Sequence, residues 1–210
     1  MKILEVEQGT KEWRDARLGM VTGTRFADVM GTTEARAKLI AELIAEEFTE
    51  QSKDNRVTAE MERGTAEEPF ALRAFEEQTG KKVTKQGMWV SEEMPWLSYS
   101  PDGPILEKGV PTEVVEVKNP DSKTVMFYRL ANHIPLEKLG LGSWVQPTKT
   151  ALKEDPMSEA TFKPSAKAPF LGIPADYKWQ CIAPFLVNPD LKRLHFLAYD
   201  ARGISSDMQA

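Results

Sequence analysis

Ser100-Pro101-Asp102-Gly103 and Glu116-Val117-Lys118 are the two stretches of this 210-residue chain that decide its fold and its chemistry. Thirteen residues separate Asp102 from Glu116, and one residue separates Glu116 from Lys118. Paired carboxylates hold hard divalent cations through oxygen, and such cations activate water and stabilise the attacking and leaving oxygens at a phosphodiester. A neighbouring lysine can orient or deprotonate the water, or offset charge on the phosphate. The pattern therefore indicates metal-assisted phosphodiester cleavage.

The residues around the second stretch alternate as a β-strand does. Glu116 and Lys118 fall on one face of a strand with period two, and Val115 and Val117 fall on the other. Asp102 lies in Pro-Asp-Gly, which favours a turn, so a hairpin from there would bring it back beside Glu116. Each residue alone also has a plain structural interpretation, as a turn former or as part of a solvated strand face.

Composition limits the class of protein. The length suits one core, and we expect a single domain over residues 1–210. The only cysteine, Cys181, excludes an internal disulfide and a four-cysteine zinc site, which favours a reducing compartment. No long apolar run near the start fits a secretory signal or a membrane span, so we expect a cytoplasmic protein with no membrane partner. The net charge of −5 argues against a broad DNA-coating surface but permits a local basic channel or a metal-bridged phosphate site.

Periodicity and turn signals predict a mixed α/β (α+β) fold, with a central sheet flanked by helices. Helices are expected over residues 10–29 with a turn near 19–24, and over 34–50, 65–79, 122–132 and 175–187. Strands are expected over residues 82–90, 96–100, 104–107, 112–118 and 191–199. Residues 143–174 contain five prolines and several lysines, and are expected to form an irregular loop that is either functional or simply a flexible surface segment.

The chain resembles the phage lambda-type exonuclease (YqaJ-like viral recombinase) family of the PD-(D/E)xK nuclease superfamily. Four ordered segments carry the likeness. Residues 13–24 match W-x3-R-x-G-x2-T-x-[S/T], and residues 64–68 match G-x3-E. Residues 100–118 hold the P-D and E-x-K core, and residues 177–180 are followed by a strand ending at 199–200. The resemblance implies a restriction-endonuclease-like core.

The resemblance also implies a metal site. Asp102 and Glu116, assisted by the Val117 backbone carbonyl, are expected to bind two Mg²⁺ ions, for which Mn²⁺ can substitute. Lys118 is expected to position the attacking water.

Two further residues are implied to act at this site. Glu68 is expected to complete the acidic cluster by holding a metal-bound water, and the G-x3-E spacing selects it over Glu67. Thr65 and Glu68 also have the spacing of a helix capping box, which is the structural alternative. Gln180 is expected to contact DNA or a metal-bound water, with an ordinary exposed helical glutamine as the alternative.

Arg17 and Thr24 are implied to bind the 5′-terminal phosphate. A guanidinium grips phosphate oxygens in a bidentate fork, and a hydroxyl adds a short donor. The structural alternative for Arg17 is a surface salt bridge with Glu12 or Asp15. The alternative for Thr24 is the N-cap of the following helix.

The implied activity is a Mg²⁺-dependent 5′→3′ exonuclease that degrades one strand of linear double-stranded DNA from 5′-phosphorylated ends. It would release mononucleotides and leave 3′ overhangs for phage-type homologous recombination. The family also implies a toroidal homotrimer, a single-strand annealing protein as partner, and a phage or prophage gene expressed in a bacterial host. Two alternatives stay open: a structure-specific or restriction-type endonuclease with the same core, and a non-catalytic DNA-end-binding module.

Overall fold

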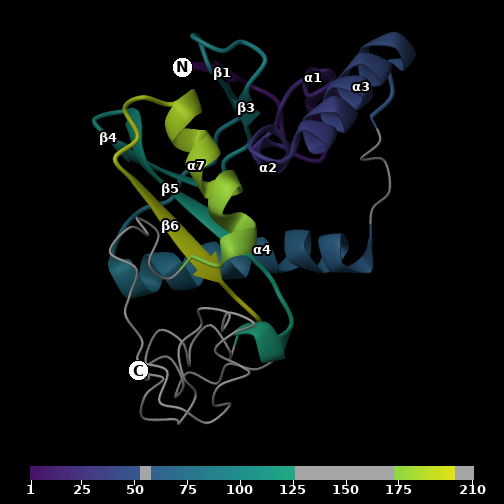
Figure 1. Ribbon diagram of the computed structural model, residues 1–210. Helices are drawn as coiled ribbons and strands as arrows, with labels where there is room; N and C mark the ends of the chain where they lie inside the picture. The colour runs from purple at the N-terminus through teal and green to yellow at the C-terminus, as the bar shows by residue number, and fades with distance from the viewer. Residues whose placement is uncertain (53–57, 126–172, 202–210) are drawn as a thin grey trace, which may run out of the picture. The chain divides into compact units, whose positions relative to one another are not determined.

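Two three-stranded sheets and the helices around them make up the described part of the chain, which comprises residues 1–52, 58–125 and 173–201 of a computed structural model (Figure 1). The chain divides into two compact units, Met1–Pro120 with Pro174–Ala210, and Asp121–Ile173. Every element below belongs to the first unit. Nearly all of the expected loop over 143–174 and most of the expected helix over 122–132 lie outside the described residues. The single-domain assignment stays a prediction.

The sheet that carries the hairpin is mixed. Its strands are β4 (Gly103–Glu107), β5 (Val110–Lys118) and β6 (Arg193–Ala198), in the order β4-β5-β6. β4 and β5 are antiparallel, whereas β5 and β6 are parallel. The predicted mixed fold class and the predicted hairpin are therefore both confirmed.

A second sheet is antiparallel and separate. Its strands are β1 (Lys2–Leu4), β2 (Met88–Val90) and β3 (Ser98–Tyr99), in that order. The described strands thus form two small sheets, of which the mixed one carries the hairpin. The expected strand over 82–90 shortens to its last three residues, and these residues pair with β1, a strand that the alternation did not reveal.

The helices of the structure differ from the expected ones mainly in the residues at which they begin. They are α1 (Lys11–Ala16), α2 (Phe26–Val29), α3 (Thr33–Thr49), α4 (Ala59–Thr79), a 3₁₀ turn η3 (Ala175–Tyr177) and α7 (Lys178–Val187). The segment expected to be helical over 10–29, with a turn near 19–24, forms two short helices with residues 17–25 between them. α4 begins at Ala59 rather than near residue 65, because the Thr58 hydroxyl caps it and accepts from the Met61 amide at 3.2 Å.

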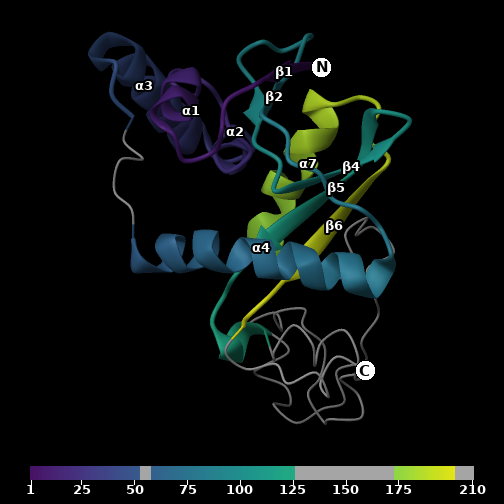
Figure 2. The ribbon, with the colours of Figure 1, turned by 180° about the vertical axis from the view of Figure 1, so that it is seen from behind.

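Helices cover both faces of the mixed sheet, with α7 on one side and α4 on the other (Figures 1 and 2). Alternation along β5 produces this arrangement. Val114 packs into a core with Ala183 and Val187 of α7, whereas Val115 and Val117 pack with α4 in a second core. Burial of β5 on both faces places its charged residues in an enclosed environment, where they need partners.

No helix among the described residues is long and apolar enough to cross a membrane.

A cluster of charged side chains links Glu113, in the first half of β5, to Lys81 and to His195 of β6. It lies apart from Glu116. Lys81 Nζ donates to both carboxylate oxygens of Glu113 at 2.8 Å, and His195 Nε2 lies 2.5 Å from Glu113 Oε2. Burial of Glu113 raises its pKa, but the bonds from Lys81 and His195 outweigh this effect and hold the pKa below its ordinary value. Glu113 thus lies on the face of β5 opposite Glu116, where Lys81 and His195 hold it.

Glu113→Gln is expected to destabilise the fold by about 1 kcal/mol near neutral pH, since a neutral amide cannot make the charge-assisted bonds. A lowered carboxyl pKa stabilises the fold above the ordinary pKa of the group, and this stabilisation is lost as pH falls through the folded-state pKa. The difference in free energy of unfolding between wild type and variant should therefore shrink in acid. Urea unfolding at about pH 7 and about pH 4 measures it. A difference that does not change with pH would contradict the assignment.

Candidate active site

The β4–β5 hairpin brings Asp102 beside Glu116. Gly103 pairs with Val115 across the hairpin, so the residue before Gly103 lies opposite the residue after Val115. The Val117 amide donates to Asp102 Oδ2 at 2.8 Å, which fixes the aspartate against the strand. The two carboxylates therefore come together through a turn and a register that the local sequence specifies.

Glu116 is the centre of the polar contacts. It is 2% exposed. Its Oε1 accepts from Lys118 Nζ and from Gln180 Nε2 of α7, both at 2.6 Å, and its Oε2 accepts from the Tyr99 hydroxyl at 2.5 Å. A buried carboxylate needs such donors because desolvation penalises its charge. Gln180, which sequence alone left between a functional and an ordinary helical role, thus lies in direct contact with Glu116.

Tyr99 is a member of this site that the sequence did not assign. Burial raises its pKa well above the ordinary value, and the carboxylates of Glu116 and Asp102 raise it further. The phenol therefore stays protonated and serves as a hydrogen-bond donor to Glu116. Its place in a short strand directly before Ser100-Pro101-Asp102 is the one signal that could have pointed to it.

The Lys118 ammonium is held by acidic neighbours. Burial lowers the pKa of this group, but the carboxylates of Glu116 and Asp102 outweigh that effect and raise the pKa above its ordinary value. Lys118 also lies over the Tyr177 ring, with Nζ 5.5 Å from the ring centroid. At neutral pH it is therefore a cation, suited to orienting water or offsetting negative charge and not to removing a proton.

Burial, together with neighbouring acids, shifts the pKa of two carboxyl groups upward. Burial raises the pKa of Asp102 well above its ordinary value, and the charges of Glu116 and Glu68 add to this rise. Burial also raises the pKa of Glu68, against a lowering by Lys85. Groups with perturbed pKa values that converge at one place are typical of functional sites. A cation placed here would relieve the repulsion.

Glu68, rather than Glu67, belongs to this acidic cluster. Glu67 Oε2 accepts from Asn119 Nδ2 at 3.2 Å, so that carboxylate has a structural partner at the end of β5. The capping-box alternative for Glu68 is wrong, because α4 already begins at Ala59. The Thr65 hydroxyl instead donates to the Met61 carbonyl within the helix, at 3.0 Å.

The donor set suits a hard divalent cation. Within the described ranges, no group of three or more His, Cys, Asp or Glu side chains is already arranged to enclose a metal ion. Asp102 and Glu116 nevertheless provide two oxygen donors at the hairpin, of the kind that Mg²⁺ prefers. Lys118 now supplies the positive charge next to Glu116, at 2.6 Å, and a bound cation would compete for that contact.

Arg17 ends α1 and stacks on an aromatic ring. Its guanidinium carbon lies 4.1 Å from the centroid of the Trp13 ring. Trp13 in turn donates from Nε1 to the Ser100 hydroxyl at 2.8 Å, two residues before Asp102. Asp15, one of the two acids considered as a salt-bridge partner of Arg17, pairs with Lys11 at 2.5 Å. Arg17 is thus connected to the Pro-Asp-Gly turn through one indole ring.

Thr24 lies on the loop between α1 and α2. It is exposed, and its hydroxyl lies 3.1 Å from that of Thr22. The alternative role as a helix cap is wrong, because Arg25 occupies the cap position of α2 and makes no side-chain capping bond. The neighbouring Gly23 lies against Tyr99, since a Cβ atom added there would come within 3.0 Å of the Tyr99 ring. The loop and the acidic cluster therefore share Tyr99 as a common neighbour.

A family model described as the YqaJ-like viral recombinase domain matches residues 12–139. The chain belongs to this family. The matched segment contains four of the elements described above: the Trp13–Thr24 segment, the Gly64–Glu68 motif, the Pro-Asp-Gly turn and the β5 strand. It ends before Gln180, whose position relative to Glu116 only the fold establishes.

Two solved structures are similar to this YqaJ-like chain. They are an alkaline exonuclease, LHK-Exo, from Laribacter hongkongensis, and the same protein in complex with dAMP. Each is 27% identical, with a TM-score of 0.63, and the match covers 95% of this chain and 78% of the other. No curated protein matches the chain in sequence. The family and the solved structures together support a nuclease or exonuclease role for this chain.

Proposed function

We propose that this protein is a Mg²⁺-dependent 5′→3′ exonuclease that digests one strand of linear double-stranded DNA from 5′-phosphorylated ends and leaves 3′ overhangs. The observation that carries the proposal is the set of contacts at Glu116. A buried carboxylate there meets Lys118, Gln180 and Tyr99, with Asp102 beside it across the hairpin. The likeness to an alkaline exonuclease supports the exonuclease part of the proposal.

Asp102 and Glu116, with the Val117 carbonyl, would hold two Mg²⁺ ions, for which Mn²⁺ can substitute. When bound, such ions activate water and neutralise charge on the scissile phosphate. Lys118 would orient the attacking water and offset negative charge on the phosphate. Gln180 would keep Glu116 in place through its amide, and Glu68 would accept a hydrogen bond from water at the same site.

The preference for DNA ends would come from Arg17 and Thr24. A guanidinium presented on the Trp13 ring can grip two phosphate oxygens, and the exposed Thr24 hydroxyl can donate to a third. A terminal phosphate exposes more oxygens than an internal one, so a pocket built from these groups favours chain ends. Because Trp13 bonds to Ser100 beside the acidic turn, the terminal phosphate would lie near the bond that is cleaved.

The biological setting is part of the proposal. We propose a toroidal homotrimer that encloses DNA, a single-strand annealing protein as partner in phage-type recombination, and action in the cytoplasm of a bacterial host. A net charge of −5 is compatible with DNA binding if basic residues line an enclosed channel. Native mass spectrometry of the purified protein measures the oligomeric state, and a mass of one or two chains would contradict the ring.

The deciding experiment uses one plasmid in two forms, linear with 5′-phosphates and covalently closed. With Mg²⁺, we expect acid-soluble nucleotide from the linear form alone. Nicking or linearisation of the circle would instead assign an endonuclease, since an end-requiring enzyme cannot start there. No cleavage of either form with Mg²⁺ or Mn²⁺ would favour a DNA-end-binding module.

Arg17→Gln is expected to lower kcat/KM on 5′-phosphorylated duplex by about thirtyfold, as for the loss of a bidentate charge-assisted contact. Activity on 5′-hydroxyl duplex should change far less, because that end lacks the phosphate. Arg14→Gln is the matched control, since Arg14 lies on the same helix and donates to the Gly9 carbonyl at 2.7 Å. An equal loss of kcat/KM on the 5′-phosphorylated and the 5′-hydroxyl duplex would show that Arg17 does not bind the terminal phosphate.

A further inference from the structure

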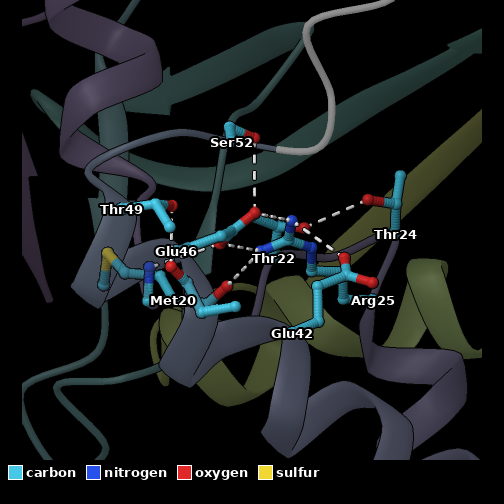
Figure 3. A network of polar contacts seen from close by, with 10 residues as sticks. Met20, Thr22, Thr24, Arg25, Glu42, Glu46, Thr49 and Ser52 are labelled. Atoms are coloured by element: carbon cyan, nitrogen blue, oxygen red, sulfur yellow. Dashed lines mark hydrogen bonds and ion pairs between the residues drawn. The ribbon is translucent and has the colours of Figure 1, made fainter.

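A buried ion pair lies behind the loop that carries Thr24. Arg25 donates from NH1 to Glu46 Oε2 at 2.8 Å and from NH2 to Glu46 Oε1 at 2.5 Å. The two residues are 8% and 2% exposed. Figure 3 shows the Arg25 side chain next to the carboxylates of Glu46 and Glu42, and it shows Thr22 and Thr24, whose hydroxyls lie 3.1 Å apart, close by. The fork-to-fork geometry is the most directional that a guanidinium and a carboxylate can form.

Stability alone does not account for such a pair. Removing two charges from water costs several kcal/mol per ion, and well-packed apolar residues of similar volume are often equally stable or more so. A directional buried pair does, however, restrict the position of the segments that it joins. Here it joins α3, which carries Glu46, to the loop over residues 19–25.

Arg25 and Glu46 also make hydrogen bonds to backbone atoms of the loop over residues 19–25. Glu46 Oε2 also accepts from the Gly19 amide at 3.4 Å, and Arg25 NH1 also donates to the Met20 carbonyl at 3.3 Å. On α3, Glu42 Oε1 lies 3.3 Å from Arg25 NH2. These contacts determine where the chain runs between Gly19, near Arg17, and Thr24.

The loop is held from its other side by the strand that bears Tyr99. The Val21 amide donates to the Trp96 carbonyl at 2.8 Å, and the Ser98 amide donates to the Val21 carbonyl at 2.9 Å. Gly23 then packs against the Tyr99 ring. Thr24 therefore lies between a segment anchored near the acidic cluster and Arg25, which is anchored to α3.

We propose that the Arg25–Glu46 pair determines specificity for the terminal phosphate, by positioning Thr24 relative to Arg17 and the acidic cluster. Neither Arg25 nor Glu46 would touch the substrate; both are positioning residues. The inference rests on the proposed function, in which Arg17 and Thr24 bind that phosphate. It adds a residue pair whose alteration should change selectivity between ends rather than binding of duplex DNA in general.

The test measures binding to two duplexes that differ only at one end, 5′-phosphate or 5′-hydroxyl, in Ca²⁺ so that binding is measured apart from cleavage. Arg25→Lys keeps the charge but removes the fork. We expect the preference for the phosphorylated duplex to fall about tenfold, with little change for the hydroxyl duplex. Arg36→Lys is the matched control, because Arg36 lies on α3 and donates to the Gly31 carbonyl at 2.7 Å.

A double-mutant cycle identifies the route of the effect. If Arg25 acts through Thr24, the losses in Arg25→Lys and Thr24→Val should not add, since either change alone removes the same contact. Glu46→Gln is measured alongside as a second, milder disruption of the pair. It should lower the preference in the same direction, and circular dichroism with thermal unfolding shows that each variant is folded.

Three results would overturn the inference. The first is an unchanged preference in both Arg25→Lys and Glu46→Gln, and the second is an equal loss on both duplexes. The third is full additivity with Thr24→Val. Failure of the proposed function is separate from these results. A wild type that prefers the phosphorylated duplex but cleaves no plasmid with Mg²⁺ or Mn²⁺ would refute the nuclease proposal and leave the role of the pair intact.

Discussion

Lys118→Ala is expected to lower cleavage of linear duplex DNA by about a thousandfold, the usual magnitude when one directed stabilising group is removed from a reaction centre. The loss should appear in kcat, while the affinity for duplex DNA in Ca²⁺ stays within a few-fold. The physical reason is the geometry at β5, where the ammonium lies 2.6 Å from Glu116 and is kept charged by the two acids beside it. Single-turnover cleavage of 5′-phosphorylated linear DNA measures the effect.

Lys192→Ala is the control for this variant. Lys192 lies one residue before β6 and pairs with Glu107 at 2.9 Å, with its side chain 67% exposed. Exposed pairs contribute little, so its activity should match wild type. Lys118→Arg is informative as well, because it keeps the charge but changes its reach. Unchanged activity in Lys118→Ala would exclude Lys118 from catalysis and favour the end-binding alternative.

Asp102→Asn is expected to abolish cleavage and at the same time to stabilise the metal-free protein by about 1 kcal/mol. The asparagine oxygen can still accept from the Val117 amide, so the hairpin keeps its bond. The removed charge is unfavourable in the folded state, because the pKa of Asp102 is well above its ordinary value. When the pKa of a carboxyl group is raised in the folded state, the free energy of unfolding falls as pH rises from the ordinary pKa to the folded-state pKa. At neutral pH the carboxyl group of Asp102 therefore destabilises the folded protein.

Thermal unfolding measures both halves of this result. Without metal, the Tm of Asp102→Asn should exceed that of wild type by about 2–4 °C, the shift expected for a chain of this size. Added Mg²⁺ or Mn²⁺ should raise the Tm of wild type but not that of the variant, since binding to the folded state stabilises it. Asp190→Asn, at an exposed turn, should behave as wild type in both conditions. A Tm of the variant that still rises with metal would place the cation elsewhere.

The local sequence was sufficient to predict the part of the site in which the catalytic candidates lie on a turn and a strand that the same residues favour. The Pro-Asp-Gly turn and the alternation of β5 specify a hairpin, and that hairpin alone brings Asp102 to Glu116. The G-x3-E spacing selected Glu68, and Glu67 proved to be bonded to Asn119. Helix limits were less accurate. The N-cap at Thr58 extended α4, and this removed the capping-box explanation of Glu68.

The sequence by itself determined the mixed fold class, the hairpin and the order of the motifs, because turns, strand alternation and helix periodicity depend on residues close together in the chain. Only the tertiary structure decided which distant residues meet. Tyr99 and Gln180 both bond to Glu116 across separations of 17 and 64 residues, and Arg25 meets Glu46 across 21. Such contacts follow from the packing of α7 against β3 and of α3 against α2. A buried charge without a partner destabilises the fold, so the buried charged groups are paired. The local sequence does not show which distant residue will be the partner.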